Sequence, residues 1–204
     1  MKRRFLRSLV LATPLSLALT GCQSAMSSSP TSSPDPSAGS YSNVNPEWPL
    51  KFRAHYFDAY CYSTYGCKVF YRGMLRADDP DDVLQLSSES LGSKYPDNLS
   101  AGMGPISNFP PPAKVIWRSK DGTPHEAEVD IGKIFKDRLI RHNVAREDAT
   151  DIPTSGTPGI ILEVNDRTIN VYMRAIIATK ELQKPGNRHS DFRNDLIKVF
   201  SQSY

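Results

Sequence analysis

Apolar and polar residues alternate along several stretches of this chain, which is the pattern of β-strands with one buried face. Val115 and Trp117 lie between the charged residues Lys114 and Arg118, and residues 127–131 alternate apolar with acidic side chains. Between the two stretches, Lys120-Asp121-Gly122 supplies a residue pair suited to the positive backbone angles of a tight turn. The pattern therefore predicts a β-hairpin over residues 115–131.

Further strands are predicted on both sides of this hairpin. Residues 52–60 predict a strand, and residues 67–75 predict the strand that pairs with it as a hairpin. Residues 160–164 are apolar enough for a central strand, and apolar side chains at every second position predict another strand over residues 169–177. One side of the first strand is expected to carry Phe52, Ala54, Tyr56 and Tyr60.

Two helices are expected among these strands. Apolar residues at i, i+3, i+4 and i+8 over residues 131–139 predict a helix that Asp130 caps and that ends near Asn143. A second helix, at the C-terminus and capped by Ser190 or Asp191, is predicted from four further apolar positions. These are Phe192, Leu196, Val199 and Phe200. The predicted fold class is therefore α+β: an antiparallel sheet built from hairpins, with one mid-chain helix and a C-terminal helix.

The first 21 residues differ from the rest of the chain. Four basic residues within positions 2–7 precede an uncharged, mostly apolar segment over residues 9–20. That segment is too short to cross a membrane, which requires about 20 helical residues. Residues 1–21 are therefore interpreted as a secretory signal peptide.

The end of this segment, Leu19-Thr20-Gly21-Cys22, resembles the lipobox of bacterial lipoproteins. The resemblance implies that Cys22 is lipidated with diacylglycerol, that the chain is cut before it, and that the new amine is acylated, for example with palmitate. Several acyl chains give durable membrane anchoring. Because Gln23 and Ser24 follow the cysteine, the resemblance favours the outer membrane, with the domain facing the periplasm. A cytosolic N-terminus and a plain secretory signal are the alternatives.

Residues 22–45 are rich in serine and proline and have almost no large apolar side chain. Such a segment cannot bury enough surface to offset its ordering entropy, so it is predicted to be a flexible tether. Its 24 or so residues would reach roughly 25–30 Å on average. Residues 46–204 are long enough for one globular α+β domain.

The charge balance argues against nucleic acid as a partner. Of the 25 basic residues, four lie in residues 1–21, which leaves 21 against 22 acidic residues in the mature chain. A chain that is almost neutral has no general electrostatic attraction to phosphate backbones.

Cysteine usage fits an oxidising compartment. With Cys22 lipidated, Cys61 and Cys67 remain, and their spacing predicts a disulfide that closes a small loop. A metal-binding pair is the competing interpretation. No second pair of cysteines or histidines lies at ligand spacing, so no metal site is predicted.

Catalytic signatures are lacking. The sequence has no Gly-x-Ser-x-Gly, His-Glu-x-x-His, phosphate loop or dinucleotide fingerprint. Its four histidines are scattered, and the aspartates between residues 78 and 82 do not have the spacing of an EF-hand loop. Glu126 and Glu128 share one face of a predicted strand, where solvent exposure explains them. We therefore expect a protein that is not an enzyme and needs no cofactor.

Aromatic residues crowd residues 56–71 around the predicted disulfide. Tyr62 and Tyr65 are expected to be exposed there, and exposed tyrosine on a stiffened loop suits a protein interface. Asp78 and Asp79, just downstream, are further candidate contacts with a partner. Ordinary strand-favouring tyrosines are the alternative.

The chain also resembles small lipoproteins encoded beside phospholipase effectors of type VI secretion. The resemblance rests on Leu19-Thr20-Gly21-Cys22, on Pro111-Pro112 leading to Val115-x-Trp117, and on Pro158-Gly159-Ile160-Ile161-Leu162. It implies an immunity protein that binds a lipase effector before the enzyme attacks the cell's own phospholipids. A structural or assembly lipoprotein of the envelope, or of a secretion machine, is the alternative, and an enzyme of unrecognised type is the third hypothesis.

Overall fold

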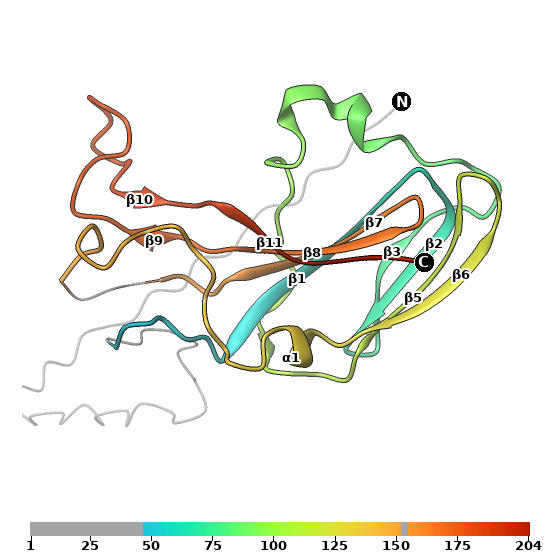
Figure 1. The fold of residues 1–204 in the computed structure, drawn as a ribbon, viewed down its shortest axis with the longest axis horizontal. Helices are drawn as coiled ribbons and strands as arrows, with labels where there is room; N and C mark the ends of the chain where they lie inside the picture. Colours follow the sequence, from blue (N-terminus) through green and yellow to red (C-terminus); the bar gives the residue numbers. More distant parts are fainter. Residues whose placement is uncertain (1–46, 152–154) are drawn as a thin grey trace, which may run out of the picture. The chain divides into compact units, whose positions relative to one another are not determined.

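Two β-sheets dominate the computed structural model, which describes residues 47–151 and 155–204 (Figure 1). The expected signal peptide, Cys22 and all of the expected tether lie outside the described residues. The larger sheet has the order β11-β8-β7-β1-β4 and the second sheet the order β3-β2-β5-β6. A two-stranded sheet pairs β9 (Ile177–Ala178) with β10 (Phe192–Arg193).

The strands of the larger sheet are β1 (Ala54–Tyr62), β4 (Ile106–Ser107), β7 (Gly159–Asn165), β8 (Thr168–Arg174) and β11 (Leu196–Ser203). The strands of the second sheet are β2 (Thr64–Tyr71), β3 (Met74–Asp78), β5 (Ala113–Ser119) and β6 (Pro124–Val129). Neighbours are antiparallel in both sheets, except that β1 runs parallel to β7.

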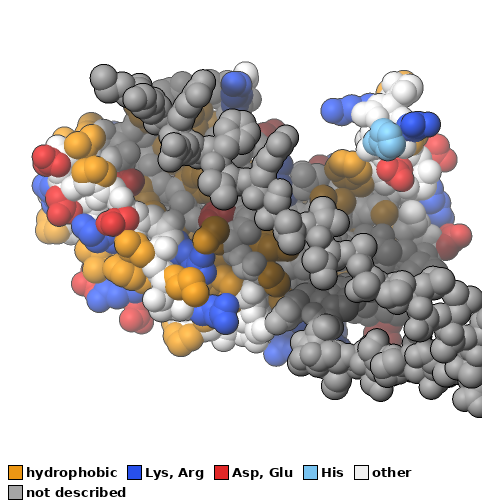
Figure 2. Space-filling view, turned by 180° about the vertical axis from the view of Figure 1, so that it is seen from behind, with side chains coloured by type: hydrophobic (Ala, Val, Ile, Leu, Met, Phe, Trp, Pro, Cys, Tyr) orange, Lys and Arg blue, Asp and Glu red, His pale blue; other side chains and the backbone are white. Residues whose placement is uncertain are grey.

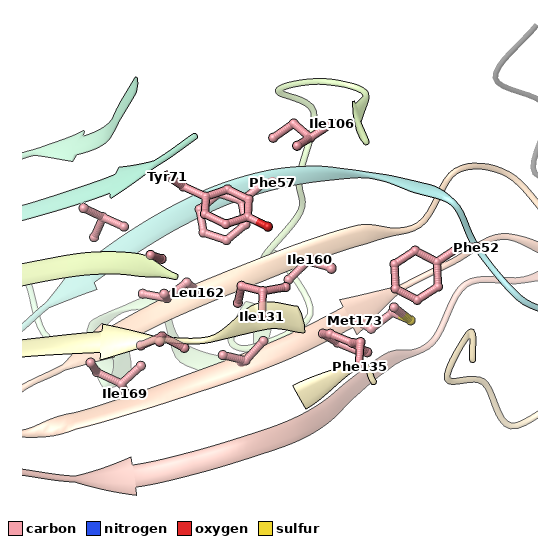
Figure 3. Packing of buried hydrophobic residues seen from close by; sticks show 14 of the residues in the cluster. Phe52, Phe57, Tyr71, Ile106, Ile131, Phe135, Ile160, Leu162, Ile169 and Met173 are labelled. Carbon is pink, nitrogen blue, oxygen red and sulfur yellow. The ribbon is translucent and has the colours of Figure 1, made fainter. Parts of the chain in front are cut away.

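Both sheets contribute alternate residues to one hydrophobic core, so they pack face to face as a β-sandwich. Phe57 of β1 meets Tyr71 of β2 across this core, with ring centroids 4.2 Å apart. Figure 3 shows this pair beside Ile160 and Leu162, which are fully buried on β7. Among the described residues, no helix is long and apolar enough to cross a membrane.

One predicted hairpin is confirmed, and two predicted strands form a second hairpin. In the first, β5 pairs with β6, Trp117 lies opposite His125, and Gly122 adopts a φ of 86° in the turn. In the second, β7 pairs with β8 through a turn at Asp166, and β7 is the central, fully buried strand that its apolar sequence predicts. Mostly antiparallel sheet is therefore confirmed, while the helical part of the α+β prediction is wrong.

The mid-chain helix is one turn long. It is α1 (Ile131–Ile134), and Asp130 caps it as expected, accepting a hydrogen bond from the Lys133 amide at 2.9 Å. The prediction that it continues to Asn143 is wrong, because Arg138 adopts a φ of 58° and the chain then runs beside residues 50–52. The amide of Phe52 donates to the Arg138 carbonyl, which gives this segment a partner outside any helix.

The predicted C-terminal helix is wrong as well. Residues 196–203 form β11, which pairs with β8, and residues 192–193 form β10. Ser190 caps no helix, since its hydroxyl hydrogen-bonds within a turn that includes Lys184 and Asn187. A bulge between Lys198 and Phe200 lets consecutive Val199 and Phe200 both pack on the core. Because of this bulge, the strand has apolar residues at positions 196, 199 and 200, which is the spacing expected for a helix.

The hairpin predicted between residues 52–60 and 67–75 does not form either. β1 and β2 are consecutive in the chain, yet they belong to different sheets, and the chain crosses between them at Ser63 with a φ of 53°. β2 pairs instead with β3 and β5. Tyr60 packs on the outer face of the larger sheet, whereas Phe57, on the opposite side of the same strand, enters the main core.

Cys61 and Cys67 form the predicted disulfide, with an S–S distance of 2.06 Å. Cys61 lies on β1 and Cys67 on β2, so the bridge ties the two sheets together where the chain crosses between them.

Opening this bridge is expected to lower the free energy of unfolding by about 2 kcal/mol, because it constrains a loop of about seven residues in the unfolded chain. The expected result is a lower urea midpoint for the Cys61→Ala/Cys67→Ala chain than for the oxidised wild-type chain. The reduced wild-type chain is the control that retains both side chains. Equal midpoints for the oxidised and reduced chains would contradict the expectation.

Candidate partner-binding site

The outer face of the β3-β2-β5-β6 sheet carries a cluster of exposed apolar side chains. Along β5, buried and exposed residues alternate strictly, and Ile116 occupies an exposed position with 36% of its surface accessible. Phe70 of β2 is 37% exposed and Leu75 of β3 is 44% exposed, and the two face each other as cross-strand partners. We call Phe70, Leu75 and Ile116 the apolar patch.

The patch is continuous across three strands. Phe70 lies opposite Lys114, and Lys68 lies opposite Ile116, so Phe70 and Ile116 are diagonal neighbours on the same face. Figure 2 shows apolar, basic and acidic side chains interleaved over the end of the molecule that this sheet occupies. Single exposed apolar residues are common, but contiguous ones on one face are typical of interaction sites.

Charged side chains of both signs surround the patch. Lys114 pairs with Glu126 at 2.7 Å, and Lys68 pairs with Asp81 at 3.1 Å and with Asp78 at 4.0 Å. These pairs are solvent-exposed, so each adds little to stability. Their effect is to surround an apolar centre with a polar rim, which is the usual composition of a protein interface.

Two of the four predicted partner contacts lie on this face. Tyr65 is half-buried on β2, and the guanidinium of Arg118 lies 5.2 Å from the centre of its ring. Asp78 is exposed at the end of β3, next to Lys68. The structure therefore brings Tyr65 and Asp78 to the same face as the apolar patch.

Tyr62 lies elsewhere, and the expectation that it is exposed is wrong. It is only 9% exposed, in a second cluster with Leu99, Ile161 and Tyr172 on the outer face of the larger sheet. The segment that contains the 3₁₀ helix η1 (Ser88–Lys94) folds back over that face and brings Tyr95 to 6.0 Å from the Tyr62 ring. Burial raises the pKa of Tyr62.

Asp79 points toward the disulfide. One of its carboxylate oxygens and the two sulfurs of Cys61 and Cys67 all lie within 4.8 Å of one another. Burial, followed by the negative charge of Asp78, raises the pKa of the Asp79 carboxyl. These three residues could offer ligands to a metal ion only after reduction, because both sulfurs are joined in the disulfide.

A buried histidine cluster lies inside the core, and the sequence did not indicate it. His55 is fully buried, with Nδ1 at 2.7 Å from Asn108 Oδ1 and Nε2 at 3.0 Å from the Tyr71 hydroxyl. Burial lowers the pKa of His55 to about 4, against the smaller opposing effect of the Asn108 hydrogen bond. The cluster is sealed by aromatic rings, including those of Phe52 and Phe109.

A buried carboxylate lies under the segment that covers the larger sheet. Glu163 is fully buried, and its Oε2 accepts hydrogen bonds from Asn170 Nδ2 at 2.8 Å and from the Tyr172 hydroxyl at 2.9 Å. Burial and the nearby Glu163 raise the pKa of Tyr172. The signal in the sequence is one acidic residue within the apolar run Ile160-Ile161-Leu162-Glu163-Val164.

A hollow of about 440 Å³ on the described surface is lined mainly by polar and charged residues. Its lining includes Asp97, Arg174 and Asp195. None of the predicted site residues lines it.

The fold and this face together define a disulfide-linked β-sandwich that presents an apolar patch within a charged rim. The chain matches no model of a known protein family, no curated protein and no solved structure.

Proposed function

We propose that this chain is a periplasm-facing lipoprotein whose β-sandwich binds and neutralises a toxic effector, a phospholipase delivered by type VI secretion. The observation that carries the proposal is the apolar patch on the outer face of the β3-β2-β5-β6 sheet. The resemblance around Cys22 and residues 111–117 and 158–162 supplies the class of partner.

The patch has the properties of an interface centre. Aromatic and aliphatic side chains that lose water on binding contribute most of the affinity of an interface, and a polar rim excludes water around them. Phe70 lies on an interior strand with hydrogen-bonded neighbours on both sides, β3 and β5. Because these side chains are held on a sheet, little conformational entropy is lost when a partner binds.

The proposed anchor places this surface where an envelope-directed enzyme acts. A lipidated Cys22 followed by a tether of roughly 25–30 Å would keep the domain close to the membrane while it turns to meet a partner. Capture near the membrane would raise the local concentration of the domain around an enzyme that attacks phospholipids.

A killing assay tests the proposal. A phospholipase encoded beside the gene for this chain is directed to the periplasm of a sensitive strain, with and without the full lipoprotein. The expected result is survival only when the lipoprotein is present, together with co-purification of the two proteins. Equal killing in both cultures would overturn the proposal, and a partner that proves to be a component of a secretion machine would favour the assembly function instead.

The patch itself is tested with a pair of matched substitutions. Phe70→Thr is expected to weaken the complex by about 30-fold, since truncating a central aromatic anchor costs about 2 kcal/mol. The matched control is Phe192→Thr, because Phe192 is 39% exposed and Phe70 is 37% exposed, but Phe192 lies on β10, in the small sheet. Isothermal titration should show unchanged affinity for the control. Equal losses for both variants would show that the patch is not the binding surface.

A further inference from the structure

The Cys61–Cys67 disulfide is asymmetric in its exposure. Cys67 is completely buried in the core, whereas Cys61 is partly exposed on β1. An external thiolate can therefore reach the Cys61 sulfur more easily, which makes Cys67 the leaving group in an exchange reaction. The leaving sulfur would carry its negative charge in a buried environment, where a thiolate is strongly disfavoured.

Asp79 stands beside this leaving group. One of its carboxylate oxygens, Oδ2, is buried and has no hydrogen-bond partner among the described residues. The Asp79 amide donates to the Cys67 carbonyl at 2.9 Å, which holds the carboxyl next to the bridge. One carboxylate oxygen of Asp79 and the two sulfurs lie within 4.8 Å of one another. Once the S–S bond breaks, the Cys67 sulfur is free to rotate toward this carboxyl group.

We propose that the Cys61–Cys67 bridge is a site of thiol–disulfide exchange with dithiols, and that Asp79 is the proton donor to the departing Cys67 sulfur. A dithiol thiolate attacks Cys61 Sγ, the S–S bond breaks, and Cys67 Sγ takes the proton of the Asp79 carboxyl. The second thiol of the reagent, as thiolate, then attacks the mixed disulfide and releases Cys61. Cys61 leaves as a thiolate and takes a proton from water. The dithiol is oxidised to a disulfide by two electrons, the protein bridge is reduced to two thiols, and Asp79 recovers a proton from water.

The surroundings of Asp79 favour this role. Burial and Asp78 raise the pKa of the Asp79 carboxyl, so it holds its proton to higher pH than an exposed aspartate does. Lys68, on the neighbouring strand, is paired with Asp78 and Asp81. A protonated Asp79 supplies a proton, whereas an ionised Asp79 repels both the attacking and the leaving thiolate.

Exchange at this bridge would act on the candidate binding surface. The bridge fixes the start of β2, the strand that carries Tyr65 and Phe70. The chemistry fits any dithiol, including the paired cysteines of a thiol–disulfide oxidoreductase. The proposal does not depend on the identity of a protein partner.

The test measures the rate at which dithiothreitol reduces the oxidised full chain, for the wild type and for Asp79→Asn, between pH 5 and pH 9. Both chains meet the same concentration of attacking thiolate at each pH, so the ratio of their rates isolates the effect of Asp79. The wild-type rate relative to that of Asp79→Asn should rise as the pH falls, by up to about tenfold, because a larger fraction of Asp79 carries its proton at lower pH. The ratio should fall to one or below at the alkaline end.

Two further variants keep the test decisive. Asp82→Asn changes a neighbouring exposed aspartate and should follow the wild-type rate at every pH. Asp78→Asn leaves Asp79 in place but removes the charge that helps to raise the pKa of Asp79. The rate of Asp78→Asn divided by the rate of Asp79→Asn should therefore fall at lower pH than the corresponding wild-type ratio. A wild-type to Asp79→Asn ratio that does not change with pH would overturn the proposal, because a merely structural effect of Asp79 has no reason to follow its ionisation.

Discussion

Replacing Trp117 with alanine is expected to lower the free energy of unfolding by about 4 kcal/mol. Trp117 is 1% exposed, and its ring stacks on His125 and meets Tyr204 edge-on at centroid distances of 5.0 and 5.6 Å. Its Nε1–H donates to the Asp166 carbonyl at 2.7 Å, which joins β5 to the turn between β7 and β8. Alanine would leave a cavity between the sheets and remove the donor from that carbonyl.

Urea denaturation of Trp117→Ala and Trp48→Ala measures this effect with an internal control. Trp48 is only partly buried and packs at the edge of the core, against His142 and beneath Arg146. Its loss is expected to cost about 1–2 kcal/mol. Similar midpoints for the two variants would contradict the position of Trp117 between the sheets.

Acidification is expected to remove about 3 kcal/mol of stability through His55 alone. In the unfolded chain a histidine has a pKa near 6.5, whereas burial lowers the pKa of His55 to about 4 in the folded chain. Between these values the unfolded chain binds a proton that the folded chain does not bind, so stability falls as the pH drops from about 6.5 to about 4. Above the upper value His55 is neutral in both states and contributes no pH dependence.

Two measurements isolate His55 from the other titrating groups. The pH slope of the unfolding free energy between pH 4 and 6.5 should be smaller in His55→Phe than in the wild type, even where the variant is less stable overall. Nuclear magnetic resonance should show the His55 ring titrating near pH 4 in the folded chain. A ring that titrates near 6.5 would show that water reaches the cluster with Asn108 and Tyr71.

The candidate binding face could be predicted only in part. The sequence pointed to the segment next to the apolar patch, because Tyr65 and Asp78 lie on the same face. It did not indicate Phe70, Leu75 or Ile116, since an exposed apolar residue in an alternating strand cannot be distinguished locally from a buried one. Tyr62 was misplaced for the converse reason: Leu99, which covers it, lies 37 positions further along the chain.

The buried polar groups escaped prediction for a related reason. His55 depends on Asn108 and Tyr71, which reach it from other segments of the chain. Glu163 depends on Asn170 and Tyr172 from the neighbouring strand. Such groups are tolerated in a core only when partners satisfy them, and partners that far along the chain leave no local pattern.

Local patterning alone accounts for the two hairpins of residues 113–129 and 159–174 and for the cap at Asp130, because adjacent side chains and turn residues set these features. The pairing of Cys61 with Cys67 could also be predicted, from their spacing and the expected compartment. Long-range strand pairing determined the other features. Residues Leu196–Ser203 form a strand because they pair with β8, and β2 pairs with β3 and β5 rather than with β1. The free energy of strand pairing and of burial against distant residues outweighs local helix propensity, which is worth only tenths of a kcal/mol per residue.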